Sequence, residues 1–270
     1  MATVGIFDSG VGGLSVLKEI RKILPGVNVI YYGDNANCPY GPKGQEFIIN
    51  RSRDITKFLI SKGADVVVIA CNTATSASAS VLRKEFNIPI IGMVPAVKPA
   101  ALCTKTMVIG VLATIGTLNA DMYKNIKDTY GGGVKIIEHI GEGFVELVEN
   151  FELNGEKTEA IIEKNIYDMV MAGADILVLG CSHYPFLQDS IEKVANRIKP
   201  ATTPRISILD PAPAVANHLK NVMLERNMEI NTDGPTIELI ASGSDVVLKQ
   251  LYNKFCIGYN TKDQEYKNCV

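Results

Sequence analysis

The sequence predicts an α/β protein made of two similar, doubly wound domains with mainly parallel sheets. Three observations point to this architecture. Short apolar runs alternate with amphipathic segments, several runs are apolar at every position, and two strand-and-loop units recur along the chain. Runs that are apolar throughout are typical of parallel strands covered by helices on both faces. The length of 270 residues suits two modest domains.

The elements of the first part of the chain follow from periodicity and turn signals. Residues 4–7 form a short apolar run that ends at a glycine-rich turn, and apolar residues at helical spacing follow until Pro25 and Gly26 stop them. The run VVVI within residues 65–70 indicates a central strand. The expected strands here are residues 4–7, 27–32, 65–70 and 88–91, and the expected helices are residues 14–24, 47–62 and 74–86.

The second part of the chain continues the same alternation of strand and helix. Its expected strands are residues 108–112, 134–138, 175–179, 205–209 and 236–240. Its expected helices are residues 119–130, 156–171, 186–198, 212–227 and 246–255. Strands that alternate with helical segments of this length predict parallel sheets.

An internal repeat supports two related halves. The segment GADVVVIAC, which ends at Cys71, resembles GADILVLGC, which ends 110 positions later at Cys181. The segment around Gly5 resembles the one around Gly110, at an offset of 105 positions. We therefore expect a first domain at residues 1–95 and 210–257, a second domain at residues 96–209, and a polar tail at residues 258–270.

Composition excludes several classes of function. The chain has 27 Lys and Arg against 29 Asp and Glu, so it lacks the basic excess of a nucleic-acid binder. It has no long apolar run that could span a membrane, and its start lacks the basic region of a signal peptide. Its six scattered cysteines form neither a disulfide framework nor a C-x-x-C metal pair. We expect a soluble protein of the reducing cytoplasm, with free thiols and no metal.

Cys71 and Cys181 occupy equivalent positions of the repeat. Each follows a buried strand, at the sheet edge where open α/β sheets bind ligands, and each precedes a helix. One such cysteine would usually be a small buried hydrophobe, but two that are each followed by polar residues indicate chemistry. A helix N-terminus is expected to lower a thiol pKa from about 8.5 toward neutrality. Two such thiols facing one substrate could remove a proton from carbon and return one to the opposite face.

Four motifs carry a resemblance to a known family. They are FDSGVGGL at residues 7–14, GD and PYG within residues 33–41, CNTA at residues 71–74 and GCSHYP at residues 180–185. Together they closely resemble the glutamate racemases of the aspartate/glutamate racemase family, in order, over about residues 4–255. The resemblance implies interconversion of L- and D-glutamate by a two-base mechanism without pyridoxal phosphate or another cofactor. It also implies a supply of D-glutamate for peptidoglycan.

The resemblance implies a role for each matching residue. Cys71 and Cys181 match the two catalytic cysteines, which act on the D- and L-isomer respectively. Asp8 matches the acidic helper of the first cysteine and His183 the helper of the second, and Glu149 lies in the segment of a further acidic helper. The positions that match substrate-binding residues are Asp8, Ser9, Pro39, Tyr40, Gly41, Asn72, Thr73, Thr114, Thr117, Ser182 and His183.

The chain departs from the family pattern at two places. Ser182 stands where the family usually has Thr, but it retains the hydroxyl group. The stretch of residues 138–143 lacks a Cys-Pro pair that is often seen there, so Glu146, one helical turn from Glu149, is the alternative acidic helper.

Simpler interpretations of these residues stay open at this stage. Asp8 could cap the following helix, His183 could be structural, and Glu149 could be a solvated charge. Cys38, Cys103, Cys256 and Cys269 lack a strand-end position, and we interpret them as packing or tail residues.

Three other functions also stay open for the whole chain. They are a racemase of aspartate or another amino acid, a two-lobed binding protein without catalysis, and an acyl-transfer enzyme with one catalytic cysteine. The expected partner is a small-molecule substrate, with no nucleic acid and no membrane. A homodimer is compatible with the resemblance, but no interface pattern stands out in the sequence.

Overall fold

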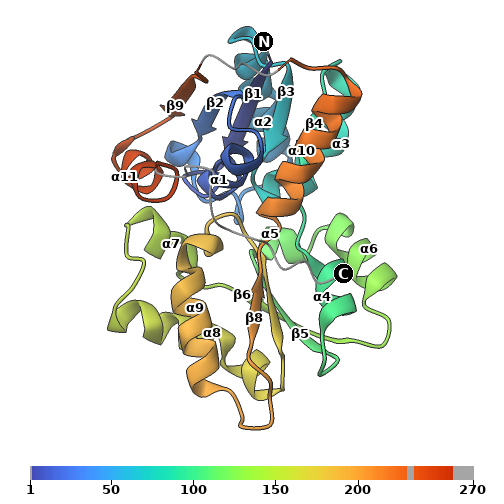
Figure 1. Ribbon diagram of the computed structural model, residues 1–270, viewed down its shortest axis with the longest axis vertical. Coiled ribbons are helices and arrows are strands. Elements are labelled where there is room, and N and C mark those ends of the chain that lie inside the picture. The colour runs from blue at the N-terminus through green and yellow to red at the C-terminus, as the bar shows by residue number, and fades with distance from the viewer. Residues whose placement is uncertain (1, 230–233, 258–270) are drawn as a thin grey trace.

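The computed structural model describes residues 2–229 and 234–257, and its strands form two parallel sheets, one in each half of the molecule (Figure 1). The five-stranded sheet has the order β4-β3-β1-β2-β9, and the four-stranded sheet has the order β6-β5-β7-β8. Every strand pairing in the described chain is parallel. The predicted fold class is thereby confirmed.

The elements lie close to the positions expected from the sequence. The strands are β1 (Thr3–Asp8), β2 (Asn28–Gly33), β3 (Val66–Ile69), β4 (Ile90–Gly92), β5 (Val108–Ala113), β6 (Lys135–Ile140), β7 (Ile176–Gly180), β8 (Ser207–Leu209) and β9 (Ile237–Ala241). The α-helices are α1 (Leu14–Ile23), α2 (Gln45–Ser61), α3 (Asn72–Glu85), α4 (Val97–Cys103), α5 (Ile115–Leu118), α6 (Asp121–Tyr130), α7 (Phe144–Glu149), α8 (Glu156–Met171), α9 (Gln188–Ile198), α10 (Ala212–Glu225) and α11 (Val246–Phe255). Two 3-10 helices, η1 (Asn35–Asn37) and η2 (Tyr184–Leu187), complete this part of the chain.

The internal repeat of the sequence is a repeat of structure. The strand order β4-β3-β1-β2 in one sheet corresponds to β8-β7-β5-β6 in the other. Val4 of β1 pairs with Val66 of β3, and Ile109 of β5 pairs with Ile176 of β7. Equivalent strands therefore bring the equivalent segments of the sequence to the same edge of each sheet.

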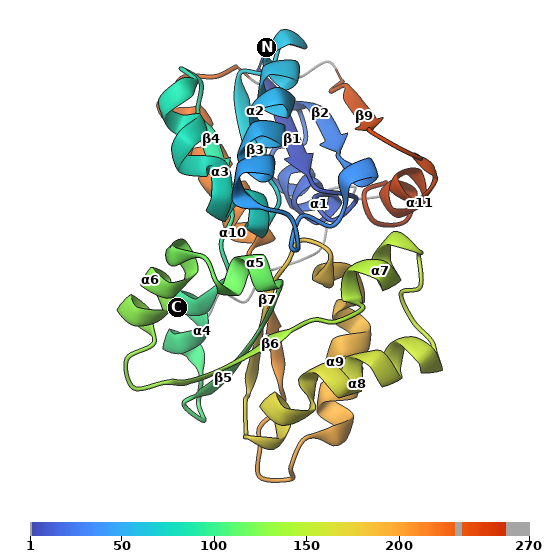
Figure 2. The same ribbon diagram turned by 180° about the vertical axis from the view of Figure 1, so that it is seen from behind.

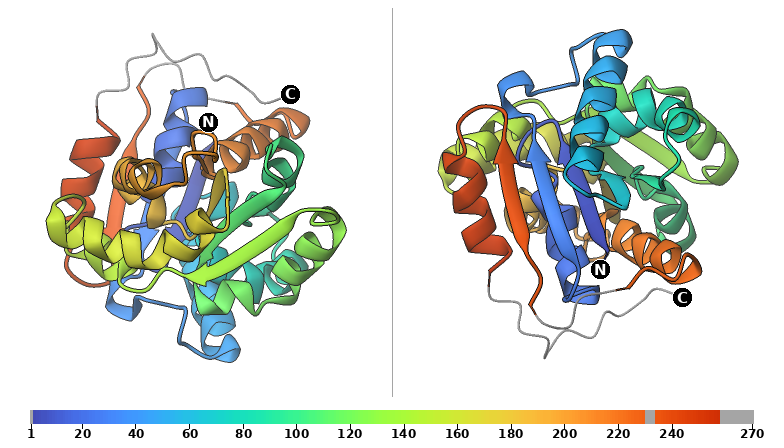
Figure 3. Two further views of the ribbon diagram at one scale, coloured as in Figure 1. Left: turned by 90° about the horizontal axis from the view of Figure 1, so that it is seen from below. Right: turned by 90° about the horizontal axis from the view of Figure 1, so that it is seen from above.

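Helices cover both faces of each sheet, as wholly apolar central strands require (Figure 3). In the first half, α1 packs with α10 on one face and α2 packs with α3 on the other. In the second half, α8 packs with α9, and α4 packs with α6. Leu14, Leu17 and Ile20 of α1 are fully buried, because helical spacing places them on one face of that helix.

The chain passes between the two halves twice (Figure 2). It leaves the first sheet after β4 and returns from β8 to α10 and β9. The boundaries of the two domains, residues 1–95 with 210–257 and residues 96–209, stay a prediction. The predicted polar tail at residues 258–270 lies outside the described residues. In the part of the chain that the structure describes, no helix combines the length and apolarity needed to cross a membrane.

The structure differs from the expected elements at several helices. Residues 186–198 were expected to form one helix, but Pro185 lies in a 3-10 turn and α9 begins only at Gln188. The sequence did not predict α4, which contains Pro99, or α5, which has only four residues. Helices that short have too little periodicity to be seen in a sequence.

Candidate active site

The carboxyl ends of four central strands meet where the two halves face each other. Asp8 is the last residue of β1 and Cys71 follows β3 by two residues, while Thr114 follows β5 and Cys181 follows β7. These are equivalent strands of the repeat, so each half contributes one thiol. A small, nearly closed pocket with a cavity volume of about 10 Å³ lies between them. Its lining consists of Ser9, Pro39, Tyr40, Gly41, Cys71, Asn72, Thr73, Thr114, Val145, Cys181, Ser182 and His183.

Cys71 is buried at the start of α3, where it is the N-cap residue. Its sulfur accepts a hydrogen bond from the backbone N–H of Ala74 at 3.4 Å and donates one to Ser9 Oγ at 3.8 Å. Burial and the nearby charge of Asp8 outweigh these contacts and raise the pKa of the Cys71 thiol to about 12. The expectation that a helix N-terminus would bring this pKa toward neutrality is wrong for Cys71, because one N–H cannot offset removal from water.

Cys181 is buried beside a histidine. Its sulfur lies 3.9 Å from Nδ1 of His183. The segment that follows is a bend leading into the 3-10 helix η2, so this thiol does not sit at the first turn of an α-helix as expected. The environment of Cys181 is therefore set by an imidazole ring, whereas that of Cys71 is set by a helix cap.

His183 and Glu149 form an ion pair behind Cys181. Nε2 of His183 lies 2.7 Å from Oε1 of Glu149, and this oxygen also accepts a hydrogen bond from the backbone N–H of Val11 at 3.0 Å. Burial alone would lower the pKa of His183, but the hydrogen bonds of its ring to two thiols and a carboxylate raise it well above its usual range. Burial opposes ionisation of Glu149 as well, yet its contacts with His183 lower the pKa of the carboxyl.

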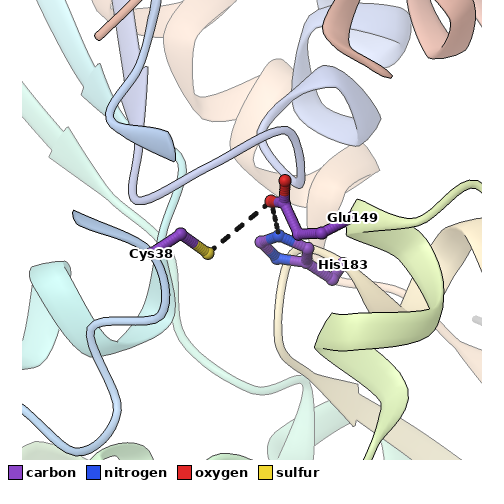
Figure 4. Close-up of side chains that lie close together, drawn as sticks. All are labelled: Cys38, Glu149 and His183. Carbon is purple, nitrogen blue, oxygen red and sulfur yellow. Dashed lines mark hydrogen bonds and ion pairs between the residues drawn. The ribbon is translucent and has the colours of Figure 1, made fainter. Parts of the chain in front are cut away.

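Glu149, and not Glu146, faces the pocket side of α7. The side chain of Glu146 is exposed, whereas Glu149 reaches His183 (Figure 4). Cys38 lies on the other side of the same carboxylate, with its sulfur 3.6 Å from Oε1. Sequence reasoning gave Cys38 only a packing role, because no signal near position 38 links it to residues more than a hundred positions away.

Asp8 is fully buried and contacts the second half of the molecule. Its Oδ1 accepts a hydrogen bond from the N–H of Gly10 at 2.8 Å, and its Oδ2 accepts one from Ser182 Oγ at 2.8 Å. Helix α1 has no side-chain cap, so Asp8 does not have the capping role that the sequence left open. Burial raises the pKa of Asp8, and the charge of His183 partly opposes this shift. Asp8 influences Cys71 through its charge, while its hydrogen bonds go to Gly10 and Ser182.

Three threonines close one side of the pocket. Oγ1 of Thr73 lies 2.9 Å from Oγ1 of Thr114 and 3.4 Å from Oγ1 of Thr117. Thr73 belongs to the first half and the other two to the second, so this cluster joins the halves. Thr117 is fully buried and supports the other two hydroxyls without lining the pocket.

The loop that carries Tyr40 and Gly41 is held by a buried acid. The hydroxyl of Tyr40 donates to Oδ2 of Asp34 at 2.6 Å, and the guanidinium of Arg51 donates to both oxygens of the same carboxylate, at 2.8 and 2.6 Å. Sequence reasoning did not single out Asp34 or Arg51 as part of the site. Bidentate pairing of this kind fixes orientation as well as charge.

Asn72 is the one pocket side chain that lacks polar partners in the described structure. Both Nδ2 and Oδ1 are buried without a hydrogen bond. A buried amide without partners costs free energy, which a bound polar ligand would recover. None of the residues that line the pocket is Lys or Arg. An anionic ligand would therefore be held by N–H and hydroxyl groups.

The structure brings most of the predicted substrate positions to one pocket. Nine line it, and Asp8 and Thr117 lie directly behind those nine. Val145, at the start of α7, also lines the pocket and was missed, because an apolar residue on an amphipathic helix looks like a core residue.

The chain is similar to known proteins in both sequence and fold. A family model described as Asp/Glu/Hydantoin racemase matches residues 5–219. The chain is 41% identical to the glutamate racemase of Methylococcus capsulatus over 239 residues, which cover 88% of this chain and 86% of that one. Its structure is similar to a glutamate racemase isoform of Bacillus anthracis, with a TM-score of 0.81 and 28% identity over 94% of both chains. It is also similar to Escherichia coli glutamate racemase in complex with L-glutamate and the activator UDP-MurNAc-Ala, with a TM-score of 0.80 and 30% identity over 94% of this chain and 95% of that one.

Proposed function

Because the chain belongs to the Asp/Glu/hydantoin racemase family and is a glutamate racemase within it, we propose that Cys71 and Cys181 are the two bases that interconvert L- and D-glutamate. The observation that supports this most strongly is the placement of the two thiols. They follow equivalent strands of two sheets and line one pocket from its two sides. Inversion at a carbon requires a proton acceptor on one face and a donor on the other.

The pocket chemistry suits a small dicarboxylic amino acid. The unpaired amide of Asn72 and the hydroxyls of Ser9 and Thr73 offer hydrogen bonds to carboxylates and an ammonium group. The backbone N–H groups at the start of α3 add a favourable dipole for an anion. The cavity of about 10 Å³ is too small to hold an amino acid, so the two halves must separate for substrate to enter.

Proton transfer follows from the two thiol environments. For L-glutamate, the thiolate of Cys181 removes the α-proton. The thiol of Cys71, which is protonated because its pKa is raised, then donates a proton to the opposite face of Cα. For D-glutamate the roles are exchanged. His183 lies within reach of the Cys181 sulfur, and Glu149 keeps this imidazole protonated, so a proton is available on that side. Oriented donors in the closed pocket stabilise the carbanion, without pyridoxal phosphate or a metal in the mechanism.

The proposed roles around this reaction follow from contacts. Asp8 and Glu149 hold Ser182 and His183 in place, and the Tyr40–Gly41 loop forms one wall. The product D-glutamate supplies peptidoglycan synthesis, as membership of the family implies. A cytoplasmic location and a homodimer stay predictions, which fractionation of cells and the mass of the purified protein in solution would test.

The test is racemisation of L-glutamate in D₂O without any added cofactor. We expect loss of optical activity, followed by circular dichroism, together with deuterium at Cα, followed by NMR. Absence of both signals would contradict the proposal.

Single substitutions distinguish two bases from one. Cys71→Ser and Cys181→Ser should each reduce racemisation at least a hundredfold, because a serine hydroxyl is a far weaker acid and base at neutral pH. Cys256→Ser, at a buried thiol remote from the pocket, is the matched control and should retain activity. A one-cysteine acyl-transfer enzyme would instead tolerate loss of Cys181. An aspartate racemase would turn over aspartate in preference to glutamate.

A further inference from the structure

Cys38, Glu149 and His183 gather three different kinds of metal ligand beside the pocket (Figure 4). One donor atom of each residue lies within 4.8 Å of the other two. Cys38 belongs to the first half of the molecule, after η1, whereas Glu149 ends α7 and His183 follows β7 in the second half. We propose that these three side chains bind a thiophilic divalent cation such as Zn²⁺, which fastens the two halves together.

The distances fit a tetrahedral ion with small side-chain movements. Tetrahedral zinc with bonds of about 2.0–2.3 Å places its ligand atoms about 3.3–3.7 Å from one another. Sγ of Cys38 lies 3.6 Å from Oε1 of Glu149. Nε2 of His183 lies 2.7 Å from the same oxygen, so this pair must separate by about 1 Å to admit an ion.

The donor set selects the kind of ion. A thiolate, an imidazole and a carboxylate suit zinc and similar borderline-soft cations, whereas Mg²⁺ and Ca²⁺ require oxygen ligands. Three protein ligands leave a fourth position for water. The backbone N–H of Val11, which donates to Oε1 of Glu149, supplies the outer support that metal-bound carboxylates usually have.

Binding exchanges protons for the metal. The thiol proton of Cys38 and the proton on Nε2 of His183 leave to solvent, and the cation takes their place between the same three atoms. Sulfur and nitrogen keep their oxidation states, so no oxidant or reductant is needed. Affinity should therefore weaken as the pH falls.

Binding of the cation at this site would affect the racemisation reaction as well as the structure. The ion would separate His183 from Glu149 and hold Cys38 of one half against α7 of the other. We expect the bound ion to slow racemisation by hindering opening of the pocket, and this expectation rests on the proposed function. Binding itself does not depend on any activity.

The test is titration of the purified, chelator-treated full chain with Co²⁺, which reports a thiolate ligand by a charge-transfer absorption band in the near ultraviolet. We expect one equivalent of band-forming Co²⁺ in the wild type and in Cys103→Ala, a control at a half-buried thiol in α4. In Cys38→Ala and in the near-isosteric Cys38→Ser, the dissociation constant should rise at least tenfold. Circular dichroism of both variants shows whether they are folded.

Two outcomes would overturn the proposed site. One is an unchanged band in a folded Cys38 variant, which would place the ion on Cys71 or Cys181 instead. The other is the absence of a thiolate band in the wild type.

Inhibition by Zn²⁺ is measured separately, and we expect the inhibitory concentration to rise at least tenfold in Cys38→Ala. Binding without inhibition would keep the site and contradict only its effect on turnover.

Discussion

Oε1 of Glu149 is the point where three segments of the chain converge. It accepts the N–H of Val11, pairs with Nε2 of His183 and contacts the thiol of Cys38. Because its oxygen accepts contacts from several donors, the carboxyl group of Glu149 stays ionised, and its negative charge favours the cationic form of the His183 imidazole. The charge state next to Cys181 therefore depends on α7, a helix that carries neither thiol, as well as on the contacts of His183 with Cys181 and Cys38.

Replacing Glu149 by Gln should lower the pKa of His183. Burial, which disfavours the imidazolium, would no longer be opposed by a carboxylate. NMR titration of the imidazole nitrogens should show His183 protonated well above pH 6.5 in the wild type and deprotonating at lower pH in the variant. His139 and His218 serve as internal controls. We also expect kcat/KM to fall about tenfold or more, since proton transfer at Cys181 loses its support.

The ion pair of His183 and Glu149 also makes the free energy of unfolding depend on pH. The folded pKa of His183 lies above that of the unfolded chain, so its contribution is complete below about pH 6.5 and is lost as the pH rises through the folded value. Glu149→Gln should weaken this dependence, with the contacts of His183 to Cys181 and Cys38 left in place. An imidazole titration that is the same in both proteins would show that the carboxylate does not control His183.

The catalytic candidates were predictable because each half repeats the other. Cys71 and Cys181 stand out once segments 110 positions apart are compared, and the structure places both at the pocket. Cys38 has no such partner, and its neighbours come from α7 and from the loop after β7. The pKa of Cys71 was mispredicted, because the sequence shows the helix start but not the depth of burial that dominates the shift.

Among the elements, the glycine-rich loop between β1 and α1 lies directly against the opposite half. A Cβ added to Gly12 would lie 2.6 Å from Ser182 Oγ and 2.8 Å from Cε1 of His183. A Cβ at Gly10 would collide with the carboxylate of Glu149 in α7, with the Cδ atom only 3.2 Å away. These glycines are required by close approach, since neither has a positive φ.

Gly12→Ala should therefore impair closure of the pocket more than folding. We expect kcat/KM to fall at least tenfold, because Ser182 and His183 must shift away from their positions. Gly44→Ala is the matched control, since no atom lies within 4 Å of its added Cβ. Gly44 has an extended backbone at the N-cap of α2, so we expect wild-type kinetics and a change in the free energy of unfolding of less than about 1 kcal/mol. Thermal unfolding and steady-state kinetics of both variants provide the check, and equal kinetics would contradict the close-approach argument.

The loop of Tyr40 and Gly41 depends on α2 through Asp34. Arg51 of α2 pairs with this fully buried carboxylate. Burial opposes ionisation of Asp34, but the hydrogen bonds from Arg51 and Tyr40 outweigh it and lower the pKa. Arg51 thus acts as a positioning residue, because it reaches the pocket only through Asp34 and Tyr40.

Arg51→Met should raise KM more than it lowers kcat, because the wall formed by Tyr40 loosens while both thiols stay in place. The free energy of unfolding should fall by on the order of 2 kcal/mol, less than for a fully buried pair because Arg51 is partly exposed. The full loss of stability should be measured at pH values above about 3.8, and it should become smaller as the pH falls through the lowered pKa of Asp34. Lys62→Met, at an exposed pair with Glu238, should change neither quantity measurably. A change confined to kcat would contradict the positioning role.

At the scale of the whole molecule, the two halves touch around the pocket at hydroxyls and backbone groups. Thr73 meets Thr114 and Thr117, Ser15 Oγ donates to the carbonyl of Ser182 at 3.2 Å, and Ser182 Oγ donates to Asp8. The sequence predicted two halves from its repeat and the sheet edge from its strand ends. It could not predict which hydroxyls meet, because such contacts depend on how the halves are packed against each other.

Substrate must pass between these contacts, so the halves must separate in each cycle. Gly41 and Thr114 line the pocket from opposite halves, and a Cβ at Gly41 would lie 3.5 Å from Cβ of Thr114. Disulfides join residues whose Cβ atoms are about 3.5–4.5 Å apart. The double variant Gly41→Cys, Thr114→Cys should therefore form a disulfide across the pocket on mild oxidation.

We expect the oxidised double variant to lose at least nine-tenths of the activity of the same protein after reduction, because the linked halves cannot open. Comparing two redox states of one protein removes the direct effect of replacing Thr114. The two single variants, oxidised in parallel, account for any oxidation of the native thiols. Peptide mapping must show the new disulfide, and full turnover by a protein that carries it would mean that substrate enters without separation of the halves at this point. Loss and recovery of activity would instead make opening between Gly41 and Thr114 an obligatory step.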